Sequence, residues 1–155
     1  NHFANHVVRP LLRSSLGTRI GRHLALLRVP GRQSGQIYEF PVQYARDADT
    51  VWVMPGSPAH KTWWRNLRPP GRDIELRLAG DDYRAHATAL EGAIAPDEVA
   101  AGLATYLSSL PRAARSLGIS SSIGAEQRSQ AERVVPDAVM VRIELAGTAG
   151  PDAPR

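Results

Sequence analysis

The feature that most constrains this fold is a series of short strand-like runs with no helix regularly placed between them. Apolar runs bounded by turn residues are expected to form strands at residues 23–29, 37–44, 50–54, 73–78, 83–90 and 138–145. Parallel strands would need helical crossovers, and no βαβ repeat is present. We therefore predict an α+β fold, a β-barrel of about six mainly antiparallel strands with peripheral helices.

Helices are expected outside this sheet and at the N-terminus. The clearest begins at Pro96, a residue favoured at the first position of a helix, with two acids in its first turn. Residues 3–16 place apolar side chains at helical spacing, interrupted by Pro10, and are expected to cover one mouth of the barrel. The other helices are expected at residues 60–67, 96–110, 111–117 and 125–133, and a mobile loop is expected at 118–124.

The chain of 155 residues fits a single domain. We expect an N-terminal helical segment (1–22), one cofactor-binding barrel domain (23–147) and a loose C-terminal tail (148–155). No apolar run approaches the ~20 residues of a membrane helix, and no signal-peptide pattern is present. We therefore expect a cytoplasmic protein, with peripheral membrane contact through the basic N-terminus as an alternative. The chain starts at Asn1 rather than methionine, so an upstream segment is left open.

Ordinary catalytic and metal-binding motifs are absent from the sequence. There is no cysteine, the five histidines have no HExxH context, and no GxSxG elbow presents a serine. We expect no metal. A pocket with few nucleophiles suits chemistry that a bound redox cofactor performs, although a non-enzymatic domain would lack such motifs too. The net charge of +4 favours anionic partners, but the basic residues are spread along the chain, so nucleic-acid binding is not expected.

Two neighbouring motifs point to a ligand that is anionic at one end and flat at the other. The turn GRQSG (31–35) offers a guanidinium, a hydroxyl and backbone N–H groups, which suit a phosphate or a polycarboxylate. The segment 51–67 carries Trp63 and Trp64. Because adjacent helical residues project about 100° apart, one indole is expected to face a pocket and the other to pack inward; we expect Trp63 to face the pocket. A simple hairpin turn and two core tryptophans are the alternative.

Together these residues resemble the deazaflavin-dependent nitroreductase family, small actinobacterial proteins that bind coenzyme F420 on a split β-barrel. The resemblance rests on the GRxSG turn, on Pro41 six residues after Gly35, on the W-aromatic-x-N-L sequence at 63–67 and on the order of elements over residues 23–145. It implies an FMN-binding-like split barrel. In that family a lysine commonly stands where Gln33 is found here, so either the cofactor tail is expected to bind more weakly or Arg28, Arg65 or Arg68 is expected to supply the charge.

The resemblance also implies a site. The cofactor-binding residues would be Arg32, Gln33, Ser34, Gly35, Gln36, Tyr38, Pro41, Val42, Pro55, Gly56, Ser57, His60, Lys61, Trp63, Trp64 and Asn66. Asn66 is expected to tie its loop by side-chain hydrogen bonds. Phe3 and Tyr106 would contact the substrate, and Tyr106 is the one candidate catalytic residue.

The expected function is hydride transfer from reduced F420 to an electron-poor acceptor such as a quinone, a nitro compound or an activated alkene. Two alternatives stay open. One is an FMN-dependent oxidoreductase on the same barrel, and the other is a non-catalytic barrel that binds a cofactor or a lipid-like ligand. The expected partner is a small-molecule electron acceptor, and the protein is expected to be a monomer or a homodimer.

Overall fold

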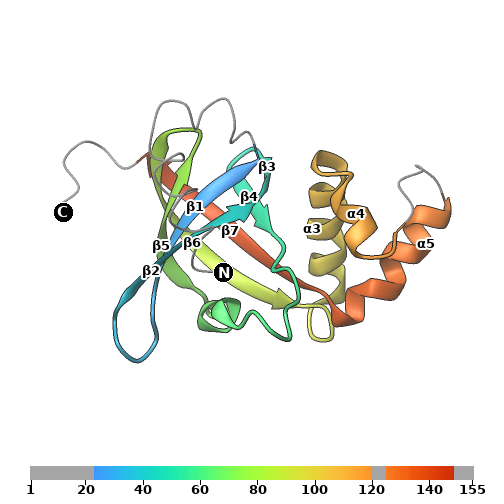
Figure 1. Cartoon of the computed structure of the whole chain (residues 1–155), viewed down its shortest axis with the longest axis horizontal. Coiled ribbons are helices and arrows are strands. Elements are labelled where there is room, and N and C mark those ends of the chain that lie inside the picture. The colour runs from blue at the N-terminus through green and yellow to red at the C-terminus, as the bar shows by residue number, and fades with distance from the viewer. Residues whose placement is uncertain (1–22, 120–124, 149–155) are drawn as a thin grey trace.

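The computed structural model describes residues 23–119 and 125–148. Within them, seven strands form one antiparallel sheet in the order β2-β1-β5-β6-β7-β4-β3. The strands are β1 (Leu24–Pro30), β2 (Ile37–Gln43), β3 (Ala45–Asp47), β4 (Thr50–Val53), β5 (Arg72–Leu78), β6 (Asp81–Glu91) and β7 (Val139–Thr148). Figure 1 shows the sheet strongly curled, with the helices gathered at one side. The predicted α+β split barrel is confirmed.

The sheet differs from the prediction by one additional strand. Arg46 and Asp47 were expected to lie in the turn between two strands, but Ala45–Asp47 forms β3, which pairs with β4 across Ala48 and Asp49. Ala45 is buried, whereas Arg46 and Asp47 are exposed. Ala48 has a φ of 52°, a left-handed conformation that a sequence pattern would assign to glycine or asparagine.

The hairpin between β5 and β6 has a two-residue turn. Leu78 pairs with Asp81, so the connecting residues are Ala79 and Gly80. Both have positive φ, 49° and 95°, as a two-residue type I′ turn requires. The last strand, expected to end at Leu145, continues to Thr148 past a register shift opposite Arg84 and Ala85.

The helices pack beside the sheet. They are α3 (Pro96–Ser109), α4 (Ala113–Ser116) and α5 (Ala125–Val134), with short 3-10 helices η1 (Trp63–Leu67) and η2 (Val135–Asp137). These agree closely with the helices expected after residue 60. The expected N-terminal helices, the residue Phe3 and most of the expected loop at 118–124 lie outside the described residues.

Two apolar clusters hold these layers together. The first fills the inside of the curled sheet around Leu27, Leu76 and Ile143, all 1% exposed or less. The second joins the sheet to α3 through Trp52 and Leu103. A β-carbon on Gly102 would lie 2.5 Å from the Trp52 ring, so α3 approaches β4 as closely as it does because residue 102 has no side chain.

Candidate functional site

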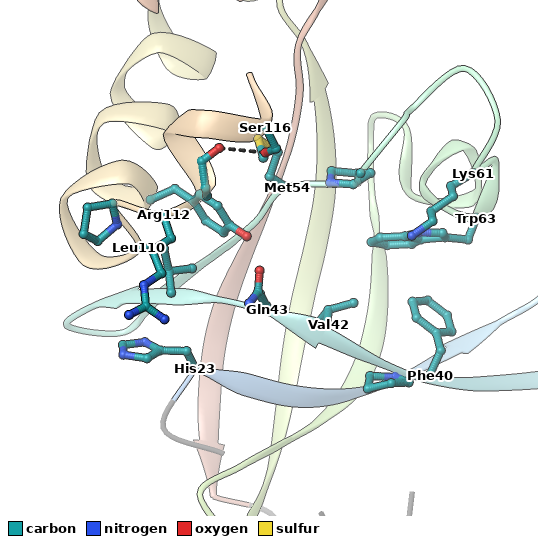
Figure 2. Close-up of a pocket in the computed structure, with 16 residues that line it drawn as sticks. His23, Phe40, Val42, Gln43, Met54, Lys61, Trp63, Leu110, Arg112 and Ser116 are labelled. Atoms are coloured by element: carbon teal, nitrogen blue, oxygen red, sulfur yellow. Dashed lines mark hydrogen bonds between the residues drawn. The ribbon is translucent and has the colours of Figure 1, made fainter. Parts of the chain in front are cut away.

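A cavity of about 1100 Å³ lies between β2, the loop after β4 and the corner that joins α3 to α4 (Figure 2). These three segments are far apart in the sequence, and the curled sheet brings them together. The cavity is lined by His23, Phe40, Pro41, Val42, Gln43, Met54, Pro55, Gly56, Lys61, Trp63, Tyr106, Leu110, Pro111, Arg112, Ala113 and Ser116.

A second cavity, of about 740 Å³, adjoins the first. It lies between the β1–β2 hairpin and η1, and it is lined by Val29, Gly31, Arg32, Gln33, Ser34, Tyr38, Phe40, Thr62, Trp63, Arg65 and Asn66. Phe40 and Trp63 line both cavities, with ring centroids 4.9 Å apart and planes at 55°. One aromatic pair therefore separates the larger cavity from the smaller one.

The two adjacent tryptophans have different environments. Trp64 is only 4% exposed and belongs to the inner core cluster. Its indole Nε1 donates a hydrogen bond of 3.0 Å to the carbonyl oxygen of Pro58, and the guanidinium groups of Arg65 and Arg68 lie over its ring. Trp63 is half-buried and lines both cavities. The 3-10 turn thus presents one indole to the site and uses the other as an anchor.

The charges around the cavities are all positive. Lys61 and Arg112 line the first cavity and Arg32 and Arg65 line the second, whereas no Asp or Glu is among the described residues that line either one. None of these four cations forms an ion pair within the described parts of the chain. A cleft with cations of one sign and no carboxylate attracts anions.

Other arginines near the site are already neutralised. Arg28 pairs with Glu39 at 3.3 Å and with Glu75, and Arg68 forms a two-pronged pair with Glu91. Of the three arginines expected to supply charge to a cofactor tail, only Arg65 therefore lines a cavity.

The GRQSG turn uses part of its own hydrogen-bonding capacity. The Gly31 N–H donates to the carbonyl oxygen of Gln36 at 2.8 Å, and the Gln36 N–H donates to Ser34 Oγ at 3.2 Å. Gly35 has a φ of 66°. These bonds shape the turn. The groups that remain able to bind a ligand are the Arg32 guanidinium and the Ser34 hydroxyl, which still has a proton to donate.

The loop between β4 and η1 is also held by its own backbone. The carbonyl oxygen of Ser57, a residue with a φ of 50°, accepts hydrogen bonds from the N–H groups of His60 and Lys61. This turn directs the Lys61 side chain toward the cavity, where Figure 2 shows it beside Trp63. Ser57 and His60 line neither cavity.

Tyr106 places a protonated hydroxyl beside the first cavity. The residue lies on α3 and is 2% exposed, and burial raises the pKa of its phenol above the usual 10.0. Within the described residues its hydroxyl has no hydrogen-bond partner. A phenol of this kind stays protonated at neutral pH and is free to donate to a molecule in the cavity.

Most of the predicted site residues come together in this pair of cavities. The structure places Pro41, Val42, Pro55, Gly56, Lys61, Trp63 and Tyr106 at the first and Arg32, Gln33, Ser34, Tyr38, Trp63 and Asn66 at the second. Lining neither are Gly35, Gln36, Ser57, His60 and Trp64. The expectation that Asn66 ties its loop is wrong for the described residues, because its side chain makes no hydrogen bond there.

Sequence analysis missed the α3–α4 wall of the first cavity and the aromatic partner of Trp63. Leu110, Pro111, Arg112, Ala113 and Ser116 form that wall, and Phe40 is the partner. His23, Gln43 and Met54 were missed as well. Phe40 precedes Pro41 on the same strand, so that position carried a usable signal. The wall had no such signal, because it shares the cavity with β2, a strand about 70 residues away in the sequence.

The search for other kinds of site gives two results. The described residues contain no group of three or more His, Cys, Asp or Glu side chains arranged to hold a metal ion. They also include no helix whose length and apolar content would let it cross a membrane.

Comparison with known proteins identifies one family and several solved structures that share the fold. The model of the family described as F420H(2)-dependent quinone reductase matches residues 5–101. An F420-H2 dependent reductase, FDR-A, superposes with a TM-score of 0.55 and 15% identity, over 79% of this chain and 95% of its own. A protein solved as a domain-swapped dimer gives 0.57 and 14%, over 90% and 95%. No curated protein matches the chain.

A third structure shares the fold but is longer. It is a protein of unknown function from Agrobacterium tumefaciens, with a TM-score of 0.53 and 19% identity. The superposition covers 90% of this chain and 58% of that one. At these identities the structural matches show only that the fold is shared. The chemistry has to be argued from the family and from the site.

Proposed function

Since the chain belongs to the F420H(2)-dependent quinone reductase family and is an F420-dependent reductase, we propose that its two adjoining cavities divide the reaction between them. The first cavity takes the deazaflavin ring and the electron acceptor. The second takes the anionic tail of the cofactor. The acceptor is an electron-poor organic molecule such as a quinone, with nitro compounds and activated alkenes as further members of the class.

The observation that carries this assignment is the pairing of a flat aromatic wall with cations that have no carboxylate beside them. F420 is elongated, with a planar ring at one end and phosphate and glutamyl groups at the other. Phe40 and Trp63 stand at the junction of the cavities. Arg32, Arg65 and the Ser34 hydroxyl line the second cavity. The residues present therefore fit the shape and the charge of the cofactor.

The protein's own residues position the reactants. When bound, reduced F420 supplies a hydride. Pro41 and Val42 lie on β2 along the first cavity, and Trp63 offers a flat apolar surface beside them. Their role is to hold a ring in one orientation and to exclude water. Lys61, next to Trp63, offers a cation to an electron-rich ring. Tyr106 lines the same cavity, and its proposed role is to give the acceptor a proton.

The direct test is a parallel titration of the purified chain with F420 and with FMN, followed by tryptophan quenching. Micromolar or tighter binding of F420, with weaker binding of FMN, is expected. Preference for FMN would leave the cavities as the binding site but make FMN the cofactor. Binding of neither would favour a barrel that holds some other ligand without turnover. Turnover is then measured as loss of reduced F420 with a quinone present and absent.

The charge of the second cavity gives a prediction about salt. Arg32→Gln combined with Ser34→Ala should weaken F420 binding about five- to ten-fold at low salt, because a charged hydrogen bond and a hydroxyl contact are lost. The loss should shrink at high salt, where charge pairing is screened. Arg84→Gln, an exposed arginine on β6 away from both cavities, is the control. A loss of F420 affinity that is the same at low and at high salt would mean that the turn acts only through its shape.

Tyr106 gives a prediction about the chemical step. Tyr106→Phe removes the hydroxyl and keeps the ring that packs in the second core cluster. We expect the rate of acceptor reduction to fall by about a hundred-fold, the lower end of the range for a lost general acid, with F420 affinity changed less than two-fold. Stopped-flow reduction at saturating acceptor separates the two quantities. An unchanged rate would mean that the acceptor takes its proton from solvent.

The oligomeric state is proposed as monomer or homodimer. A relative with this fold was solved as a domain-swapped dimer, which supports a test by light scattering with and without F420.

A further inference from the structure

The first cavity has a second basic end, away from the aromatic pair. Figure 2 shows the Arg112 guanidinium beside the His23 ring at the end opposite Lys61 and Trp63, with the Gln43 amide between the two ends. Leu110 and Met54 lie along the intervening wall. The cavity therefore carries cationic or hydrogen-bond-donating side chains at both ends, with the Gln43 amide and the apolar side chains of Leu110 and Met54 between them.

The backbone at Arg112 is held in place, although the Arg112 side chain is exposed. It precedes α4 with a φ of −67° and a ψ of −25°, and the next residue, Ala113, donates its N–H to the carbonyl oxygen of Leu110 at 2.9 Å. Ala114 is fully buried in the second core cluster. The α3–α4 corner thus holds the base of the Arg112 side chain over the cavity.

This guanidinium has no partner in the described structure. Arg142 on β7 pairs with Glu98 of α3, and Arg68 pairs with Glu91, but no described carboxylate lies within ion-pair distance of Arg112. No acid among the residues that the structure describes lines the cavity that it faces. An unpaired arginine beside a histidine and a glutamine amide is suited to a planar anion, which a guanidinium binds through two parallel hydrogen bonds.

We propose that Arg112, with His23 beside it, forms a subsite for an acidic substituent on the acceptor. The reductase then prefers electron-poor ring compounds that carry a carboxylate or a similar anionic group over neutral ones. The inference rests on the proposed function for the place of the acceptor. The acidic group remains unchanged in the reaction and serves to orient the ring between the two ends of the cavity.

The test compares two oxidised quinones of similar size, anthraquinone-2-carboxylate and the neutral 2-(hydroxymethyl)anthraquinone. Their binding is measured by calorimetry on the full chain, both without cofactor and with saturating oxidised F420, so no turnover occurs. Wild-type protein should bind the carboxylate about ten-fold more tightly than the alcohol, as one charge-assisted pair would give. That preference should fall as salt is added.

Arg112→Gln should remove most of the preference and change binding of the neutral quinone less than two-fold. Arg112→Lys should retain part of it. The matched control is Arg115→Gln, an exposed arginine within α4 that does not line the cavity, and it should behave as wild type.

Three results would overturn the proposal. Equal losses for both quinones would mean that Arg112 acts through the shape of the corner. No loss for either would mean that it does not touch the acceptor. Weaker F420 binding with unchanged quinone binding would assign Arg112 to the cofactor. Failure of wild-type protein to bind F420 would count against the proposed function alone, because the quinone comparison is also made without cofactor.

Discussion

Replacing Trp64 with alanine should lower the free energy of unfolding by about 3–5 kcal/mol, and replacing Trp63 should instead weaken F420 binding by about 1–3 kcal/mol. Trp64 is 4% exposed in the inner core, and its indole N–H bonds the carbonyl oxygen of Pro58. Trp63 is half-buried and lines both cavities. Chemical denaturation gives the first quantity and titration with F420 gives the second.

Each tryptophan is the control for the other. Both substitutions remove an indole from the same short 3-10 helix, so a general effect on that helix would lower stability and affinity together in both variants. Trp63 also packs against the inner core, so a smaller loss of stability is expected there. Equal cofactor affinity for Trp63→Ala and wild type, with the variant folded, would remove Trp63 from the site.

Gly92→Ala should destabilise the protein by at least about 3 kcal/mol, because it forces two backbone segments apart. A β-carbon at this position would lie 1.6 Å from the carbonyl oxygen of Val135. Neither segment can easily move: the Gly92 N–H donates to the carbonyl oxygen of Ala138, and the Ala138 N–H donates to that of Val135. Thermal and denaturant unfolding, each followed by circular dichroism, would measure the loss.

Gly56→Ala is the matched control for stability. The nearest atom to a β-carbon there is the end of the Lys61 side chain, at 3.8 Å, so little strain is expected and stability should change by less than about 1 kcal/mol. If Gly92→Ala proved as stable as Gly56→Ala, the junction between the end of β6 and η2 would have to be looser than the structure shows.

The strands and the long helix could be predicted because their signals are local. The alternation of Ile74, Leu76 and Leu78 marks a half-buried strand, and all three side chains are buried. The start of α3 follows from Pro96 and the acids after it. The strand β3 could not be predicted, because it is three residues long and its turn uses a left-handed alanine at position 48.

The candidate site was predictable only where its residues sit near one another in the sequence. The turn around Arg32, the strand at Pro41 and the segment before Trp63 are motifs in their own right, and the cavities bring them together. The contribution of Arg112 depends on how α3 docks against the sheet. That docking depends on Trp52 packing against Gly102, a pairing that no local pattern records.

The place of β2 in the sheet has a consequence for the energetics of ligand binding. Among the described strands, β2 pairs only with β1, and it carries Phe40, Pro41, Val42 and Gln43 into the first cavity. A strand held on one side only can open while the rest of the sheet stays intact, so we expect its amide protons to exchange through partial rather than global unfolding. A ligand that binds only the closed form lowers the population of the open form, so occupancy of the cavity and the rigidity of its edge are thermodynamically linked.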